Sequence, residues 1–131
     1  MTKGCDVLVI EDHEDIREGL AITLALEGYT VEKASNGLEA LAKLHVGLRP
    51  RLIITDLMMP MMNGFEFRRA QLADPELAEV RLIAYSAVAD PTESAQHLHA
   101  DAYLYKPTDM AATMELVRQF CPKLNTGVSA P

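Results

Sequence analysis

Five polar side chains with metal-binding or phosphate-binding chemistry follow short apolar runs of this sequence. They are Glu11, Asp12, Asp56, Ser86 and Lys106. The runs before them cover residues 7–10, 51–55, 80–85 and 102–105. Mg²⁺ commonly combines one or two carboxylates with waters and phosphate oxygens. A lysine ammonium and a serine hydroxyl both donate hydrogen bonds to phosphate oxygens. Together these residue types indicate a Mg²⁺-assisted phosphoryl site.

The order of the segments predicts that these residues meet at one edge of a sheet. Short runs rich in apolar and β-branched residues are typical of buried strands, and the segments between them carry apolar residues at helical spacing. Alternating strands and helices build a parallel sheet covered by helices on both faces, with all carboxyl ends at one edge. Contact with solvent would explain one polar strand end. It explains the whole set poorly, because three crowded carboxylates need protons or a cation.

The strand that ends in Asp56 is the centre of this pattern. It is expected to begin at Arg51, since Pro50 closes the connection before it. A lone ionised carboxylate costs several kcal/mol to bury, so Asp56 needs cationic or hydrogen-bonding partners. Residues 30–34 are of mixed polarity and are expected to form an edge strand.

Two amphipathic helices are predicted before this strand. The first ends at Gly28, and its apolar side is read from Ile16, Leu20 and Leu24. The second begins near Asn36, which with Glu39 resembles a capping box. The residues read as carrying this second helix are Leu38, Leu41, Leu44 and His45.

Three more helices are predicted after the strand that ends in Asp56. Asn63 and Gly64 form a turn signal, and the helix that follows ends before Pro75. A weaker helix follows Pro91, and a last helix is capped by Thr108 or Asp109.

Composition bounds the class of protein. A chain of 131 residues, 49% hydrophobic, suggests one domain with a real core. Its formal net charge of −7 argues against non-specific nucleic-acid binding by this domain. The sequence shows no membrane span and no signal peptide, so a cytoplasmic location without membrane contact is expected. Cys5 and Cys121 match no metal spacing and are read as ordinary thiols.

These residues and motifs together resemble the receiver domain of response regulators, the phosphoacceptor of two-component signalling. The matching fragments in chain order are Glu11 with Asp12, Asp56 with Met59, Pro60, Asn63 and Gly64, Ser86 with Ala87, and Lys106 with Pro107. The resemblance covers about residues 5–120. It implies a three-layer α/β fold of the flavodoxin-like type, a (βα)5 arrangement with a five-stranded parallel sheet in the order 2-1-3-4-5. The domain is expected to cover residues 1–121, and residues 122–131 a flexible tail or linker stump.

The resemblance also implies a metal site. Asp12 and Asp56 resemble direct Mg²⁺ ligands, with the backbone carbonyl of Met58 as a third. Glu11 would hold a metal-bound water. His13 adjoins the acid pair, but it is not expected to bind Mg²⁺, which prefers oxygen ligands.

The remaining roles are those of phosphoryl transfer and switching. Asp56 is similar to the phosphoacceptor that forms an acyl phosphate. Lys106 resembles the charge that pairs with Asp56 and then with the phosphoryl group. Ser86 and Tyr103 resemble the switch pair, in which the hydroxyl moves to the phosphoryl oxygen and the aromatic ring turns inward.

Partners follow from the same resemblance. A sensor histidine kinase or a histidine phosphotransfer protein would donate the phosphoryl group. A downstream protein would bind the surface near the fourth helix and fifth strand, and a phosphorylation-dependent homodimer is a further expectation. The chain would be a signalling phosphoacceptor rather than an enzyme, because it catalyses only its own phosphorylation and dephosphorylation.

Three other functions remain open. A pseudo-receiver would bind partners without phosphorylation, although the complete residue set counts against it. A Mg²⁺-dependent phosphohydrolase typically carries a second acid two residues after its nucleophile, where this sequence has Met58. A flavin module needs a phosphate loop rich in small residues after the first strand, where residues 11–15 are mostly acidic.

One stretch departs from the family pattern. The segment between Ser86 and Lys106 is shorter than usual, and an Ala-Gly-Ala turn is replaced by the sequence His99, Ala100, Asp101, Ala102. An altered helix and an unusual choice of partner are expected there.

Overall fold

The structure is a computed structural model that describes residues 1–86, 98–105 and 110–123. Five strands and four helices lie in these residues. They are β1 (Lys3–Ile10), α1 (Glu14–Leu26), β2 (Val31–Ala34), α2 (Gly37–His45), β3 (Leu48–Asp56), α3 (Gly64–Ala73), β4 (Arg81–Ser86), β5 (Ala102–Tyr105) and α5 (Met110–Phe120). Of these helices, none is long and apolar enough to cross a membrane.

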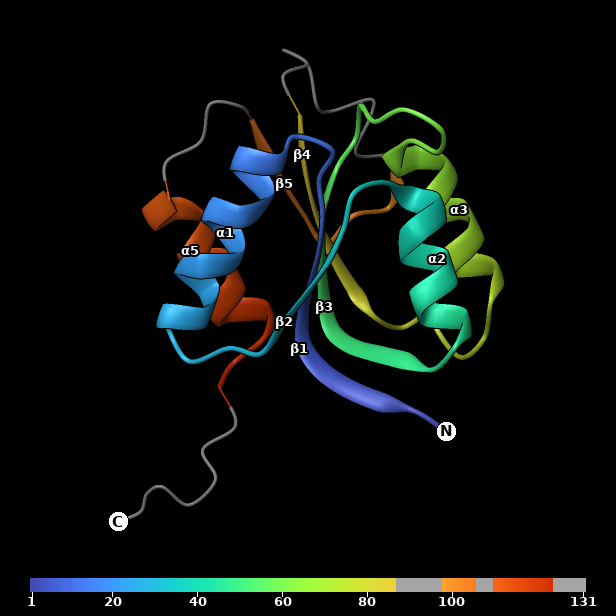
Figure 1. The fold of residues 1–131 in the computed structure, drawn as a ribbon, viewed down its shortest axis with the longest axis horizontal. Coiled ribbons are helices and arrows are strands. Elements are labelled where there is room, and N and C mark those ends of the chain that lie inside the picture. Colours follow the sequence, from blue (N-terminus) through green and yellow to red (C-terminus); the bar gives the residue numbers. More distant parts are fainter. Residues whose placement is uncertain (87–97, 106–109, 124–131) are drawn as a thin grey trace.

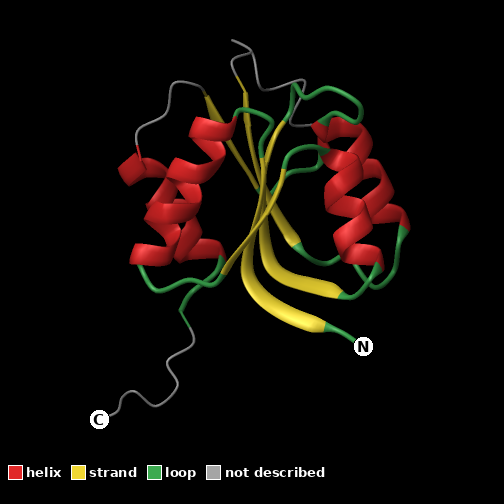
Figure 2. Ribbon diagram, viewed as in Figure 1, coloured by secondary structure: helices red, strands yellow, loops and turns green. Residues whose placement is uncertain are grey.

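The five strands form one parallel sheet in the order β2-β1-β3-β4-β5, which confirms the predicted order and the edge position of β2. Figure 1 shows α1 and α5 on one face of the sheet and α2 and α3 on the other. Figure 2 shows the resulting three layers of helix, sheet and helix. All carboxyl ends of the strands therefore lie at one edge, at the top of both views.

The sheet separates two apolar clusters, one under each helix layer. Leu8, Ile53 and Phe67 belong to the cluster under α2 and α3. Val9 and Ile54 belong to the cluster under α1 and α5. Burial of one such side chain contributes about 1.5–3 kcal/mol. Within β3, none of residues 52–56 is more than 3% exposed, so the predicted burial of this strand on both faces is confirmed.

The predicted start of the central strand is wrong, because β3 begins at Leu48 and contains Pro50. The register pairs Pro50 with Cys5 of β1, whereas pairing with β4 starts only at Leu52. At Pro50 the strand therefore has a neighbour on one side only, and a missing N–H is tolerated there. The same pairing extends β1 back to Lys3.

The predicted end of α1 at Gly28 is confirmed. Gly28 has φ +101° and donates its N–H to the Ala25 carbonyl at 3.0 Å. Tyr29 donates its N–H to the Leu24 carbonyl at 3.1 Å. These two bonds form a Schellman motif, in which the left-handed conformation favours glycine.

Two of the predicted apolar positions are exposed. Ile16 is 43% exposed in the first turn of α1, which follows β1 after three intervening residues. The buried side of α1 is instead Leu20, Ala21 and Leu24. Leu38 is 45% exposed in the first turn of α2, where Ala40 and Leu44 are buried. His45 is also exposed, and Leu41 is half-buried.

The predicted start of α2 at Asn36 is confirmed, but only half of the predicted capping box forms. Asn36 accepts the Glu39 N–H at 2.8 Å, but the Glu39 carboxylate accepts from the N–H and hydroxyl of Ser35, at 2.7 and 2.6 Å, instead of from Asn36. A complete capping box occurs at α3, where Asn63 and Glu66 satisfy each other's N–H groups at 2.9 and 3.0 Å. The Asn63 turn signal is therefore a helix start.

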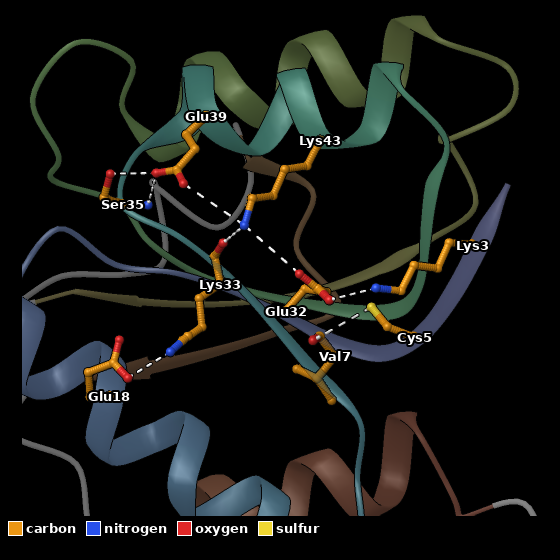
Figure 3. Close-up of polar contacts among 9 residues, drawn as sticks. All are labelled: Lys3, Cys5, Val7, Glu18, Glu32, Lys33, Ser35, Glu39 and Lys43. Carbon is orange, nitrogen blue, oxygen red and sulfur yellow. Dashed lines mark hydrogen bonds and ion pairs between the residues drawn. The ribbon is translucent and has the colours of Figure 1, made fainter. Parts of the chain in front are cut away.

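Charged side chains line the edge strand β2 (Figure 3). Lys33 binds Glu18 of α1 at 2.7 Å, and Lys3 of β1 binds Glu32 at 3.3 Å. Lys43 of α2 donates to the backbone carbonyl of Lys33. A hollow of about 360 Å³ lies along this strand, lined by charges of both signs that pair with one another. Such charges protect a sheet edge from pairing with another chain.

A buried arginine ties α3 to the segment before β5. Arg68 is 6% exposed and donates to Gln71 Oε1 at 2.9 Å and to the His99 carbonyl at 2.6 Å. Longer bonds reach the carbonyls of Val80 and Leu98 at 3.3 and 3.4 Å. His99 lies in the stretch that departs from the family pattern, and its backbone adopts a φ of +56°.

Several predictions lie partly or wholly outside the described residues. The weaker helix predicted after Pro91 falls mostly on residues outside the described ranges; Leu98, its one large aliphatic residue, is described and is buried. The last helix is confirmed as α5, but its predicted caps, Thr108 and Asp109, lie outside.

Cys5 and Cys121, which were expected to be ordinary thiols, are both free, and both are buried. Burial raises the pKa of Cys5 to about 11, so this thiol stays protonated at neutral pH.

Candidate functional site

The carboxyl ends of β1 and β3 bring the predicted acidic residues together. Ile10 pairs with Thr55 in the register, so the residues that follow each strand are neighbours. One carboxylate oxygen from each of Glu11, Asp12 and Asp56 and one ring nitrogen of His13 all lie within 4.8 Å of one another. We call these four residues the acidic cluster.

Glu11 is fully buried, and both of its carboxylate oxygens are hydrogen-bonded. Oε1 accepts from the Tyr85 hydroxyl at 2.6 Å. Oε2 accepts from the backbone N–H of His13 at 2.9 Å and lies 3.2 Å from His13 Nδ1. Arg17 of α1 donates to the Glu11 carbonyl at 3.0 Å. The Glu11 carboxylate is therefore oriented by the protein itself.

Tyr85 keeps its proton beside this carboxylate. Burial raises the pKa of the Tyr85 phenol far above its usual range, and its hydrogen bond to Glu11 raises it further. The phenol is therefore a permanent neutral donor to Glu11.

Asp12 presents a buried acceptor that the described part of the chain does not satisfy. Its Oδ1 is inaccessible to solvent and has no hydrogen-bond donor among the described residues. The His13 Nδ1 atom lies 3.6 Å away, beyond hydrogen-bonding distance. A buried carboxylate oxygen without a donor is unusual, and a cation at this position would satisfy it.

Asp56 is held at the end of β3 by its backbone surroundings. It is 3% exposed, and its Oδ1 accepts the Met58 N–H at 3.2 Å. Leu57 donates its N–H to the Tyr85 carbonyl at 3.2 Å. Gly64 packs so closely that an added Cβ would lie 2.7 Å from the Asp56 carbonyl oxygen. The loop after Asp56 is therefore closely packed, and this packing restricts movement of the Asp56 carboxylate.

The charges of the cluster make a cation favourable. Two carboxylates 4–5 Å apart repel each other by about 3–4 kcal/mol at an effective dielectric constant of about 20. Three such carboxylates, including the unsatisfied Oδ1 atom of Asp12, fit a hard divalent cation that binds oxygen ligands. His13 also lies in the cluster, although its side chain is largely exposed.

The structure describes only some of the contacts of the other predicted site residues. Met58 exposes 63% of its surface, while its backbone contacts Asp56. Ser86 ends β4, and its backbone pairs with Tyr105. Tyr103 is half-buried on β5 and packs against the cluster under α2 and α3. Lys106 lies outside the described residues. The proposed roles of these residues stay predictions.

The sequence pattern does not single out Tyr85, because this residue falls at the end of the apolar run of residues 80–85. The available signal was its chemistry: a buried tyrosine generally finds a partner for its hydroxyl group. This tyrosine is the last residue before Ser86 and pairs with Asp56 in the register, so it lies at the functional edge of the sheet.

Comparison with families of known proteins places most of the chain in one family. Residues 7–118 match the model of the response regulator receiver domain. An uncharacterised 14.6 kDa protein of Leptolyngbya boryana is 38% identical over 119 residues, which are 88% of this chain and 89% of that protein.

Two longer relatives have named functions. The response regulator RR06 of Streptococcus pneumoniae is 35% identical over 115 residues, and the DNA-binding dual master transcriptional regulator RpaA of Synechocystis is 32% identical over 114 residues. Each alignment covers 86% of this chain, but only 51% of RR06 and 47% of RpaA. The chain thus spans about half the length of these relatives.

Solved structures agree with this result. The chemotaxis response regulator CheY4 of Vibrio cholerae superposes with a TM-score of 0.81 at 29% identity, covering 90% of this chain and 99% of CheY4. The response regulator TrrA of Thermotoga maritima, in complex with Mg²⁺ and BeF, has a TM-score of 0.77 at 29% identity and covers 92% of this chain and 99% of TrrA. The family match, the relatives and the shared fold show that this chain belongs to the receiver-domain family of two-component response regulators.

Proposed function

We propose that this chain is a phosphorylation-driven switch in which Asp56 accepts a phosphoryl group from a phosphohistidine. The observation that carries the proposal is the position of Asp56, buried at the end of β3 beside the buried, unsatisfied carboxylate oxygen of Asp12. An Asp56 oxygen would attack phosphorus, forming a P–O bond as the P–N bond breaks. The histidine nitrogen keeps the bonding electron pair and takes up a proton.

The residues around Asp56 support this step by positioning and charge. Asp12, Asp56 and the Met58 carbonyl would hold Mg²⁺, with Glu11 acting through a water. When bound, Mg²⁺ would neutralise charge on the phosphoryl oxygens. Lys106 would supply a second positive charge. Most of the acceleration in phosphoryl transfer comes from such positioning and electrostatic stabilisation.

The product would act as the signal. A phosphoryl group adds nearly two negative charges at neutral pH. The hydroxyl of Ser86 and the ammonium of Lys106 would move toward these charges, and Tyr103 would follow inward. The surface near the fourth helix and β5 would then change its binding of a downstream protein. The phosphoryl group would thereby shift an equilibrium between two conformations that exist before phosphorylation.

The expected partners are those of a signalling phosphoacceptor rather than a metabolic enzyme. A sensor histidine kinase or a histidine phosphotransfer protein would supply the phosphoryl group, and a phosphorylation-dependent homodimer remains a proposal. We assign this role to residues 1–121, in a cytoplasmic location and without direct contact to nucleic acid. The named DNA-binding function of RpaA belongs to a protein about twice as long.

Mass spectrometry after treatment with acetyl phosphate tests the proposal. The expected result is addition of one phosphoryl group to Asp56 only when Mg²⁺ is present. Asp56→Asn should abolish the addition, whereas Asp15→Asn, at an exposed carboxylate in the first turn of α1, should not. A wild-type chain that stays unmodified would contradict the proposal and favour the pseudo-receiver.

A further inference from the structure

One contact links β4 to the acidic cluster across the intervening strand. In the sheet, β3 lies between β4 and β1. The side chain of Tyr85 nevertheless reaches the Glu11 carboxylate, and the two residues are 74 positions apart in the sequence. Both side chains are buried, at 5% and 0% exposure, so water does not readily replace this bond.

The contact has the properties of a strong, fixed hydrogen bond. The distance of 2.6 Å from the Tyr85 hydroxyl to Glu11 Oε1 is typical of an O–H donor to a charged oxygen. The main chain of Tyr85 adds a second contact, because its carbonyl accepts the Leu57 N–H next to Asp56. One residue therefore holds the Glu11 carboxylate and the backbone beside Asp56 at the same time.

Removal of the hydroxyl group would release one side of Glu11. The bond from the Tyr85 hydroxyl to Oε1 would be lost, while the His13 N–H would still donate to Oε2 at 2.9 Å. Groups that orient the ligands of a metal ion typically change its affinity by 10–100-fold when they are mutated.

We propose that Tyr85 is a positioning residue for divalent-cation binding: its hydroxyl group fixes the Glu11 carboxylate in the orientation that the acidic cluster needs to bind Mg²⁺. This inference rests on the proposed function, because it assigns Mg²⁺ to that same cluster. It adds a residue that neither the motifs nor the acid pair indicate.

Isothermal titration of each protein with Mg²⁺ alone tests the inference. Tyr85→Phe should weaken Mg²⁺ binding by about tenfold or more. Tyr29→Phe is the matched control. Tyr29 is a second buried tyrosine in the same apolar cluster, and its hydroxyl has no hydrogen-bond partner within the described ranges. Its variant should bind Mg²⁺ with wild-type affinity. Far-UV circular dichroism at the titration temperature verifies that both variants are folded.

A double-mutant cycle with Glu11→Gln separates positioning from a general structural effect. If Tyr85 acts through the Glu11 charge, Tyr85→Phe should change Mg²⁺ affinity less than about twofold in the Glu11→Gln background. An equal loss in both backgrounds would overturn the inference. So would a Tyr85→Phe protein that is less stable to heat but binds Mg²⁺ as tightly as the wild type.

Measurements on the wild-type protein distinguish failure of this inference about Tyr85 from failure of the proposed function. Wild type that binds Mg²⁺ and is phosphorylated at Asp56, together with an unchanged Tyr85→Phe affinity, refutes the role of Tyr85 alone. Wild type that neither binds Mg²⁺ nor accepts a phosphoryl group refutes the proposed function, and this inference with it.

Discussion

Replacing Arg68 by methionine should destabilise the domain far more than the same change at the neighbouring Arg69. Both arginines lie on α3, but Arg68 is 6% exposed and Arg69 is exposed. Methionine keeps much of the apolar stem and removes the five N–H donors of the guanidinium. The comparison therefore isolates the hydrogen bonds from the packing.

The magnitude follows from the bonds that are lost. Two short bonds, to Gln71 Oε1 and the His99 carbonyl, would each contribute about 1.5–3 kcal/mol as bonds from a charged donor. The Val80 carbonyl would keep the amide of Gln71 as a donor at 2.9 Å. Burial lowers the pKa of Arg68, which reflects the cost of desolvating its charge and offsets part of the gain. A net loss of about 2–4 kcal/mol is expected.

Urea denaturation followed by circular dichroism measures this loss. Arg69→Met should stay within about 0.5 kcal/mol of wild type, as exposed substitutions usually do. Next to the Arg68 contacts, the Leu82 N–H donates to the Asp101 carboxylate and the Asp101 N–H donates to the Leu82 carbonyl, each at 2.8 Å. Hydrogen exchange at these two amides should become faster in Arg68→Met. Equal stabilities for the two variants would show that the buried guanidinium does not anchor the segment before β5.

Three further predictions concern caps and close packing. Asn63→Ala should lower the free energy of unfolding by about 1 kcal/mol in urea denaturation, because it removes the capping box of α3; an unchanged midpoint would show that this cap contributes nothing. Gly64→Ala should cost about 1–3 kcal/mol, since its Cβ would meet the Asp56 carbonyl, whereas Gly4→Ala, with nothing within 4 Å, should be nearly neutral. Hydrogen bonds from the Ser35 hydroxyl and, to a smaller extent, from the Ser35 N–H lower the pKa of Glu39 below its ordinary value of 4.5. These bonds therefore stabilise the folded state fully above pH 4.5, and this stabilisation is lost as the pH falls through the lowered pKa of Glu39 in the folded protein. Ser35→Ala should therefore be less stable than wild type at pH 7, with the difference shrinking in acid, and NMR titration should show the Glu39 pKa rising; a pKa that does not move would refute the assigned cause.

The strands and the acidic cluster were predictable because their signals are local. Short apolar runs ending in polar residues predicted strands close to their observed positions, and parallel pairing placed Glu11 near Asp56. The strand order itself came from resemblance to a family rather than from periodicity. Pro50 was placed outside β3 because its tolerance depends on which neighbouring strand it faces, and that register is not visible in one sequence.

The contacts that sequence reasoning missed are long-range and polar. Arginine is normally exposed, so no pattern marks Arg68 as a buried anchor for residues 12–31 positions further along the chain. Tyr85 fitted an apolar strand, and its bond to Glu11 depends on side chains that meet only in the folded sheet. Such contacts follow from packing between elements, which local periodicity does not encode.

The most direct test of the central claim is a crystal structure of the protein grown with Mg²⁺ and beryllium fluoride, the ligands present in the Thermotoga maritima TrrA complex. We predict a Mg²⁺ ion among Glu11, Asp12 and Asp56, and a beryllium fluoride group attached to an Asp56 oxygen. A structure in which these carboxylates turn away from one another, with neither ligand bound at saturating concentration, would contradict the account.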